Sequence, residues 1–156
     1  MQGYIPVIVC FDAHYAPYAA VATHAALSQS ASALKIYWVT TRADLARATA
    51  MRDIVQKTGA SITIVDVAEQ RFSEWKETHH ISRAAYLKLL LPELIPEDRA
   101  IYLDCDTITL GDLRELCEIP LGSCRVAGAV DPPGSEICNV QRKQGDIYMN
   151  SGVMLL

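Results

Sequence analysis

The chain alternates short apolar runs with segments of helical spacing, and this pattern restricts its fold more than any other feature. Residues 16–30 and 42–59 carry small and apolar residues at helical spacing, and the second segment ends at Gly59, a residue that favours helix termination. A strand, helix, strand, helix, strand order predicts a parallel sheet covered by helices. The apolar runs, each typical of a buried strand, span residues 4–10, 35–40, 61–67, 100–104, 125–130 and 152–156. The expected fold class is α/β, with a Rossmann-like, mostly parallel sheet flanked by helices.

The length and charge of the chain restrict its organisation and its partners. With 156 residues, 51% of them hydrophobic and 21% charged, the chain is the size and composition of one packed domain, and we expect a single domain over residues 1–156. The formal net charge is -4, and the basic residues form no long run. A nucleic-acid partner is therefore not expected, because such binding depends on clustered positive charge.

The cysteines and the hydropathy pattern predict the location of the protein. The five cysteines are an odd number and include no C-x-x-C spacing, which argues against a disulfide framework and against a zinc site. Reduced thiols favour a cytoplasmic protein. Nowhere do about 18 apolar residues run together, so no transmembrane segment is predicted, whereas peripheral binding to a membrane surface is compatible with the sequence.

A further helix is predicted over residues 81–94, where Ala84, Leu87 and Leu91 share one face. The last apolar run, residues 152–156, ends the sequence without a polar cap. It allows two interpretations: a strand that pairs into the sheet, or an apolar end that a partner covers, for example in a homodimer.

Open α/β sheets bind ligands beyond the carboxyl ends of their strands, so polar residues at those positions are candidates for a site. Neither G-x-G-x-x-G nor G-x-x-x-x-G-K-[ST] occurs, which excludes the usual dinucleotide and P-loop phosphate sites. Polar or thiol side chains that follow the first, fourth and fifth apolar runs, or directly precede the sixth, are Cys10, Asp12, His14, Tyr15, Asp104, Asp106, Asp131, Asn150 and Ser151.

Asp104 and Asp106 follow the fourth apolar run with one cysteine between them. On an extended segment, alternate residues face the same side, so both carboxylates can point at one ion while Cys105 faces away. Such hard oxygen ligands suit Mg²⁺ or Mn²⁺, which can act as a Lewis acid on a diphosphate leaving group. A turn that begins with aspartates explains the pair equally well, and the pair alone does not decide between the two.

The order and spacing of several motifs resemble glycosyltransferase family 8, which includes bacterial lipopolysaccharide galactosyl- and glucosyltransferases and glycogenin. The resemblance covers nearly the whole chain and implies a glycosyltransferase A type fold. It also implies a cytoplasmic enzyme, peripheral to the inner membrane, that transfers a hexose with retention from a UDP-hexose to a saccharide or lipopolysaccharide acceptor, with Mn²⁺ or Mg²⁺. The matching segments are "VIVCFDAHYAPYAAVATHA", "HHISRAAYLKLLLPELIP", "RAIYLDCDTITLGDLREL" and "YMNSGVMLL".

The resemblance assigns a role to each candidate residue, although it identifies no catalytic nucleophile or base. Asp104 and Asp106 would hold the metal ion, on either side of Cys105. Lys88 stands where many relatives have an arginine that grips the donor, and lysine cannot make the same two-pronged contact. The residues expected to seat the nucleotide are Cys10, Asp12, His14 and Tyr15. Those expected to contact or position the donor sugar are Lys88, Asp131, Asn150 and Ser151.

Members of this family continue well past the matched segments and supply a histidine metal ligand from a later H-x-x-G-x-x-K-P-W motif, which this sequence lacks. We therefore expect the donor-binding portion only, truncated at its carboxyl end, with weak or no transfer activity. Two alternatives stay open. One is a haloacid dehalogenase-type phosphatase, although Ile108 stands where its D-x-D-x-T signature has threonine. The other is a non-catalytic domain that binds nucleotide sugars or forms oligomers.

Overall fold

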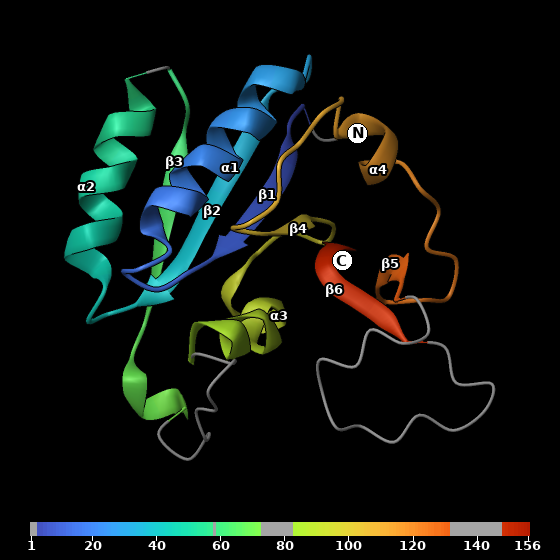
Figure 1. Ribbon diagram of the computed structural model, residues 1–156. Helices are drawn as coiled ribbons and strands as arrows, with labels where there is room; N and C mark the ends of the chain where they lie inside the picture. The colour runs from blue at the N-terminus through green and yellow to red at the C-terminus, as the bar shows by residue number, and fades with distance from the viewer. Residues whose placement is uncertain (1–2, 58, 73–82, 132–147) are drawn as a thin grey trace.

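The computed structural model describes residues 3–57, 59–72, 83–131 and 148–156. Figure 1 shows a central sheet with helices on both of its faces. The elements are β1 (Ile5–Cys10), α1 (Ala16–Gln29), β2 (Leu34–Thr41), α2 (Leu45–Gln56), β3 (Ile62–Val67), the 3₁₀ helices η1 (Glu69–Phe72) and η2 (Arg83–Leu90), α3 (Leu91–Leu94), β4 (Ile101–Asp104), α4 (Arg114–Cys117), β5 (Ala127–Val130) and β6 (Met149–Leu155).

The six-stranded sheet has the order β3-β2-β1-β4-β6-β5. β3, β2, β1 and β4 are parallel, whereas β6 runs antiparallel to both β4 and β5. From β1 the chain first builds the sheet in one direction and then crosses to the other side with β4, so the strand order reverses between β1 and β4. The predicted α/β class and mostly parallel sheet are confirmed, and the reversal marks the position at which such sheets bind ligands.

Each face of the sheet has its own apolar layer, as the alternation of side chains along a strand requires. Val7 and Val9 of β1 belong to the layer beneath α1 and α2, whereas Ile8 and Cys10 belong to the layer beneath η2 and α3. In the first layer, Trp38 donates a hydrogen bond from Nε1 to Thr23 Oγ1 at 2.8 Å. This bond satisfies the buried indole N–H and fixes α1 against β2.

The helix predicted over residues 81–94 is only partly confirmed, since residues 83–90 form the 3₁₀ helix η2 and only 91–94 form an α-helical turn. Residues 81 and 82 lie outside the described part of the chain. The buried side chains of η2 are Ala84, Leu87 and Leu90, spaced by three. Three residues per turn is the 3₁₀ period, so this winding places all three on the sheet.

The last apolar run pairs into the sheet, as the first of its two interpretations predicts. Met154 and Leu155 of β6 are buried, with exposed fractions of 7% and 0%. The strand begins earlier than predicted, at Met149, so Asn150 and Ser151 lie within it and do not precede it. The apolar end therefore needs no partner to cover it.

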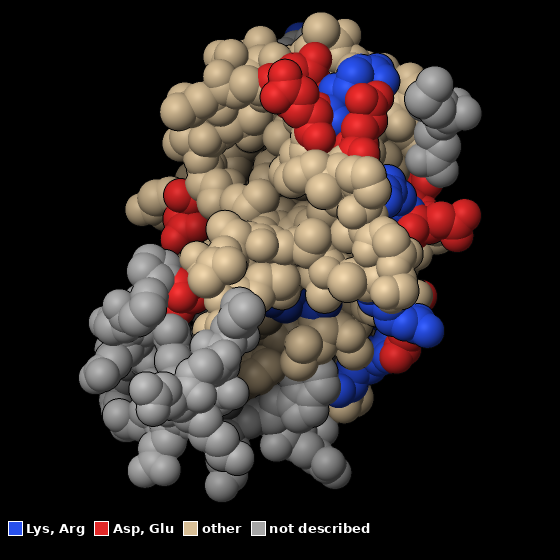
Figure 2. All heavy atoms as spheres, turned by 90° about the vertical axis from the view of Figure 1, so that its right-hand side faces the viewer, with Lys and Arg blue, Asp and Glu red and all other residues tan. Residues whose placement is uncertain are grey.

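No helix in the described residues is long and apolar enough to cross a membrane. The side of the molecule that carries α4 and β5 is largely uncharged at its centre, with acidic and basic side chains around it (Figure 2). Three exposed apolar residues belong to this side: Ile119 follows α4, Val126 directly precedes β5, and Val130 ends β5. The homodimer stays a prediction.

Candidate functional site

Three strand ends meet at one edge of the sheet. The register pairs Cys10 of β1 with Asp104 of β4, so both parallel strands end at the same level. β6 runs the opposite way and pairs Val153 with Leu103, which brings the beginning of β6 to this edge. The candidate residues of these three strands are therefore neighbours, although they come from distant parts of the sequence.

Lys88 is directed at this edge by η2. Its Nζ lies 3.1 Å from Asp104 Oδ1, and it donates to the backbone oxygen and to Oγ of Ser151 at 3.3 and 3.4 Å. Only 16% of the Lys88 side chain is exposed. Lys88 is thus no solvated helix residue, and its positive charge lies between the ends of β4 and β6.

Tyr102 is a supporting residue that the sequence analysis missed. It is buried on the η2 side of β4, its hydroxyl donates to Asp104 Oδ1, and Lys88 Nζ lies 4.8 Å from the centre of its ring. Burial is the main cause that raises the pKa of this hydroxyl, so it stays protonated and can donate. Its position two residues before Asp104 on a strand, and hence on the same face, was the available signal.

The backbone of the D-x-D segment differs from the prediction. β4 ends at Asp104, and Cys105 and Asp106 form a turn closed by Thr107, whose N–H and hydroxyl donate to the Asp104 carbonyl at 3.1 and 2.7 Å. The extended geometry expected through Asp106 is therefore wrong, because the hydrogen bonds of a turn replace the strand ladder. The turn leaves the Asp106 side chain exposed.

The two thiols at this edge are poor nucleophiles. Burial raises the pKa of the half-buried Cys105 thiol to about 11, and the negative charges of Asp106 and Asp104 add to the effect. A smaller contribution comes from the negative charge of Asp12. Burial also raises the pKa of Cys10. Both thiols stay protonated near neutral pH and act as small packed side chains.

The segment after β1 forms a tight turn into α1. Asp12 Oδ1 accepts hydrogen bonds from the backbone N–H groups of His14, at 2.9 Å, and Tyr15, at 3.2 Å. The carboxylate of Asp12 therefore shapes the turn, as aspartates often do. His14 and Tyr15 are exposed, and the Tyr15 ring lies 5.6 Å from that of Tyr18. These aromatic side chains are accessible to a ligand at the end of β1.

The beginning of β6 lies close to Asp104. Asn150 Oδ1 accepts a hydrogen bond from the Gly152 N–H at 2.8 Å, and a Cβ on Gly152 would lie only 3.2 Å from Asp104 Oδ2. The lack of a side chain at Gly152 leaves space for the carboxylate, a role that the sequence analysis missed. Asp131 follows β5, where its N–H donates to the Tyr148 carbonyl at 2.8 Å, two strands from β4.

The carboxylates at this edge fit a small divalent cation. Asp104 Oδ1 accepts hydrogen bonds from Tyr102 and Lys88, whereas Oδ2 and the Asp106 carboxylate accept none from the described residues. Free carboxylate oxygens suit Mg²⁺ or Mn²⁺. Within the described ranges, no three histidine, cysteine or acidic residues are grouped to hold a metal, so water and substrate oxygens would have to complete the shell.

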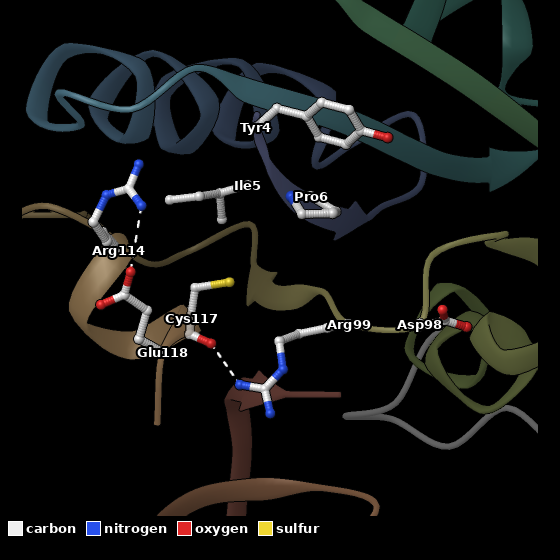
Figure 3. A pocket seen from close by; sticks show the side chains of 8 residues that line it. All are labelled: Tyr4, Ile5, Pro6, Asp98, Arg99, Arg114, Cys117 and Glu118. Carbon is white, nitrogen blue, oxygen red and sulfur yellow. Dashed lines mark hydrogen bonds and ion pairs between the residues drawn. The ribbon is translucent and has the colours of Figure 1, made fainter. Parts of the chain in front are cut away.

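A separate pocket of about 420 Å³ opens at the other end of β1 and β4 (Figure 3). Arg99 and Arg114 lie in it, but Arg99 donates to the Cys117 and Ile119 carbonyls and Arg114 bonds Glu118. These cations are already neutralised or bonded. The pocket therefore offers weaker ligand chemistry than the edge where β1 and β4 end, where Asp104 contacts the partly buried ammonium of Lys88.

Comparison with known proteins identifies the family. The family model described as "Glycosyl transferase family 8" matches residues 6–156. The chain belongs to glycosyl transferase family 8. The resemblance inferred from the motifs is thereby confirmed.

Two curated relatives illustrate how far family 8 similarity extends. General stress protein A of Bacillus subtilis is 28% identical over 110 residues, which are 68% of this chain and 38% of the relative. A putative glycosyltransferase of Haemophilus influenzae is 25% identical over 156 residues, 96% of this chain and 47% of the relative. The chain spans about half the length of these relatives or less.

A solved family structure gives the same fold. The galactosyltransferase LgtC, crystallised with donor and acceptor sugar analogues, superposes with a TM-score of 0.83 at 23% identity, over 97% of this chain and 57% of LgtC. The glycosyltransferase A type architecture is thus confirmed. The roles of single residues are not tested by a similarity at this level and stay predictions.

Proposed function

We propose that this family 8 chain binds a UDP-hexose together with Mn²⁺ or Mg²⁺ and transfers the hexose, with retention, to a saccharide or glycolipid acceptor. One observation carries the proposal: the partly buried ammonium of Lys88 lies beside Asp104, whose Oδ2 accepts no hydrogen bond from the described residues, at the point where the strand order reverses. A diphosphate bound to a divalent cation needs both of these charges.

The donor would lie along the edge from β1 to β6. The turn after β1 would seat the nucleotide, with the exposed rings of His14 and Tyr15 against base and ribose and Asp12 fixing the turn. Cys10 lies buried beneath this turn as a packed side chain. The residues that would contact the hexose are Lys88, Asp131, Asn150 and Ser151, and those that would hold the metal are Asp104 and Asp106 on either side of Cys105.

In the transfer step, the bond between the anomeric carbon and the β-phosphate oxygen breaks, and its electron pair stays on the departing UDP. The acceptor hydroxyl oxygen forms the new bond, and its proton passes to the departing phosphate oxygen or to water. A divalent cation supplies Lewis-acid stabilisation of the diphosphate when it is bound. Lys88, held by Asp104 and Ser151, adds a fixed positive charge beside the leaving group, and such preorganised charge lowers the barrier by several kcal/mol in typical sites.

Isothermal titration with UDP, with and without Mn²⁺, tests the donor site. We expect binding that requires the metal and that EDTA reverses. An absence of binding at millimolar UDP, or binding that EDTA leaves unchanged, contradicts the proposal. Release of hexose from UDP-hexose then distinguishes a transferase from the non-catalytic binding domain, and p-nitrophenyl phosphate hydrolysis tests the phosphatase, which the family match disfavours.

We place the protein in the cytoplasm, peripheral to a membrane surface if its acceptor is a glycolipid. The supporting observation is that Cys10, Cys105, Cys117 and Cys124 are free thiols, as expected in a reducing compartment. Fractionation of cells with an antibody against the chain checks this placement. Recovery in an extracellular fraction would contradict it.

A further inference from the structure

Two buried tyrosines occupy equivalent places on the sheet face beneath η2 and α3. Tyr37 of β2 and Tyr102 of β4 both pair with Ile8 of β1, so they lie in one row on either side of it. Both belong to the same apolar layer, with exposed fractions of 4% and 1%. A buried phenol must satisfy its hydroxyl, and each of the two does so on a carboxylate.

The surroundings of the two hydroxyls are alike in type. Tyr37 donates to Glu97 Oε1 at 2.6 Å, and Tyr102 donates to Asp104 Oδ1. Each ring also has an ammonium group near its face, Lys35 Nζ at 5.2 Å from the Tyr37 ring centre and the lysine of η2 at 4.8 Å from that of Tyr102. Only Tyr102 has its carboxylate partner in the candidate site, so Tyr37 serves as a reference that lies outside the site.

Tyr102 determines which oxygen of Asp104 is free. Its ring is immobilised by burial, so its hydroxyl is a fixed donor, and Oδ1 also accepts from Lys88. With Oδ1 held on two sides, the carboxylate cannot rotate without losing both bonds. Oδ2, beside Gly152, is left as the single oxygen that the described residues do not occupy.

We infer that Tyr102 is a positioning residue of the cation site: it holds Asp104 so that Oδ2 alone binds the metal, and its ring keeps Lys88 beside the diphosphate. The inference rests on the proposed donor site and deepens it. A carboxylate that is already oriented loses less side-chain entropy when the cation binds, so the hydroxyl contributes to metal affinity without touching the metal.

The experiment compares Tyr102→Phe with Tyr37→Phe in the full chain. Each variant removes one buried hydroxyl that donates to a carboxylate, and each leaves the ring in the same apolar layer. Mn²⁺ affinity is measured directly, by electron paramagnetic resonance of free Mn²⁺ in the presence of UDP, and thermal unfolding is followed by circular dichroism. We expect Tyr102→Phe to weaken Mn²⁺ binding by about 10- to 100-fold, the usual effect of losing a partner of a metal ligand.

Tyr37→Phe should leave Mn²⁺ affinity within about twofold of the wild type. It should lower the unfolding temperature at least as much as Tyr102→Phe does. If the wild type itself does not bind Mn²⁺ with UDP, the proposed donor site is wrong. If the wild type binds and both variants bind equally well, Tyr102 is only structural and the inference is overturned.

Two unnatural residues at position 102 make the test independent of whether the phenylalanine variant folds. 4-Aminophenylalanine keeps a donor at the ring tip, whereas 4-fluorophenylalanine fills the same space without one. We expect the amino form to retain Mn²⁺ affinity within a few-fold of the wild type and the fluoro form to lose it as phenylalanine does. Equal affinities in the two would contradict a role for the hydroxyl.

Discussion

Two groups, each made of a tyrosine, a carboxylate and a lysine, lie on the same face of the sheet. We call one the closed group because its carboxylate is buried, and the other the open group because its carboxylate is partly exposed. Glu97, with Tyr37 and Lys35, has a side chain only 5% exposed. Asp104, with Tyr102 and Lys88, has a side chain 34% exposed. The two groups share their chemistry, so the difference between them comes from where the fold places each carboxylate.

Glu97 of the closed group lies in the connection between α3 and β4, and it accepts hydrogen bonds on both oxygens, including weaker ones from Tyr4. Because this carboxylate is almost fully buried and hydrogen-bonded on both oxygens, we expect it to act on stability rather than on ligand binding. Asp104 ends a strand at the reversal of strand order and keeps one oxygen free within the described part of the chain. A partly satisfied carboxylate at a ligand-binding edge is what a cation site requires.

Exchanging each carboxylate for its amide should separate the two groups most strongly. Asp104→Asn keeps an acceptor for Tyr102 but loses the charge that holds the cation. We expect Mn²⁺ affinity to fall by about 100-fold or more, beyond what a supporting residue contributes. Titration of Mn²⁺ into protein with UDP measures the change.

Glu97→Gln is the matched control, since it makes the same chemical exchange in the closed group. It should leave the Mn²⁺ dissociation constant unchanged. A loss of Mn²⁺ binding in Glu97→Gln as large as that in Asp104→Asn would show that the two groups do not have separate roles.

Glu97 of the closed group should contribute to the acid dependence of stability. The ammonium of Lys35 and the hydroxyl of Tyr37 hold the pKa of Glu97 below its usual range. A lowered carboxyl pKa stabilises the fold at pH values above the unfolded-state pKa of about 4.3, and this contribution is lost as the pH falls through the native pKa. Glu97→Gln should therefore cost about 1–2 kcal/mol of unfolding free energy at pH 7.

Urea unfolding of wild type and Glu97→Gln at pH 7, 5, 4 and 3 measures this contribution. The difference in unfolding free energy should be constant from pH 7 to about pH 5 and should shrink below about pH 4. Comparing the two proteins cancels the contributions of other acidic groups to the pH dependence, such as that of Glu69, whose pKa is also lowered. A difference that grows as the pH falls would contradict the assignment.

Most of the fold could be predicted from the sequence, because short apolar runs and helical spacing are local signals. The ranges of the first five strands, α1, α2 and the stop near Gly59, which has a φ of +88°, agree with the structure to within about two residues. The 3₁₀ winding of η2 was not predicted, since residues at i, i+3 fit both helix types. The earlier start of β6 was missed because Asn150 and Ser151 are polar, and the pairing of β6 with β5, which extends to Met149, overrides their preference.

The residues gathered at the site were predicted individually, but their contacts were not. Lys88 and Ser151 are 63 positions apart, and only the sheet order brings them together. Tyr102 and Gly152 were overlooked because an aromatic residue and a glycine in strands suggest packing and flexibility, respectively, and their role depends on which neighbour they face. The register between strands that are distant in the sequence decides which neighbour each residue faces. No short segment of sequence contains this register.

Gly152→Ala is the smallest change that should disturb the open group alone. The new Cβ would lie 3.2 Å from Asp104 Oδ2 and 3.1 Å from Asn150 Oδ1, tighter than ordinary contacts, so one carboxylate oxygen must shift by a few tenths of an ångström. The shift moves the free oxygen without removing it, and we expect Mn²⁺ affinity to fall only a few-fold. Overpacking should cost about 1 kcal/mol or less, because residue 152 is only half-buried.

Gly111→Ala, where nothing lies within 4 Å of the added methyl, is the control and should leave Mn²⁺ affinity unchanged. Equal Mn²⁺ affinities in Gly152→Ala and the wild type would mean that Asp104 Oδ2 is not the oxygen that binds the metal.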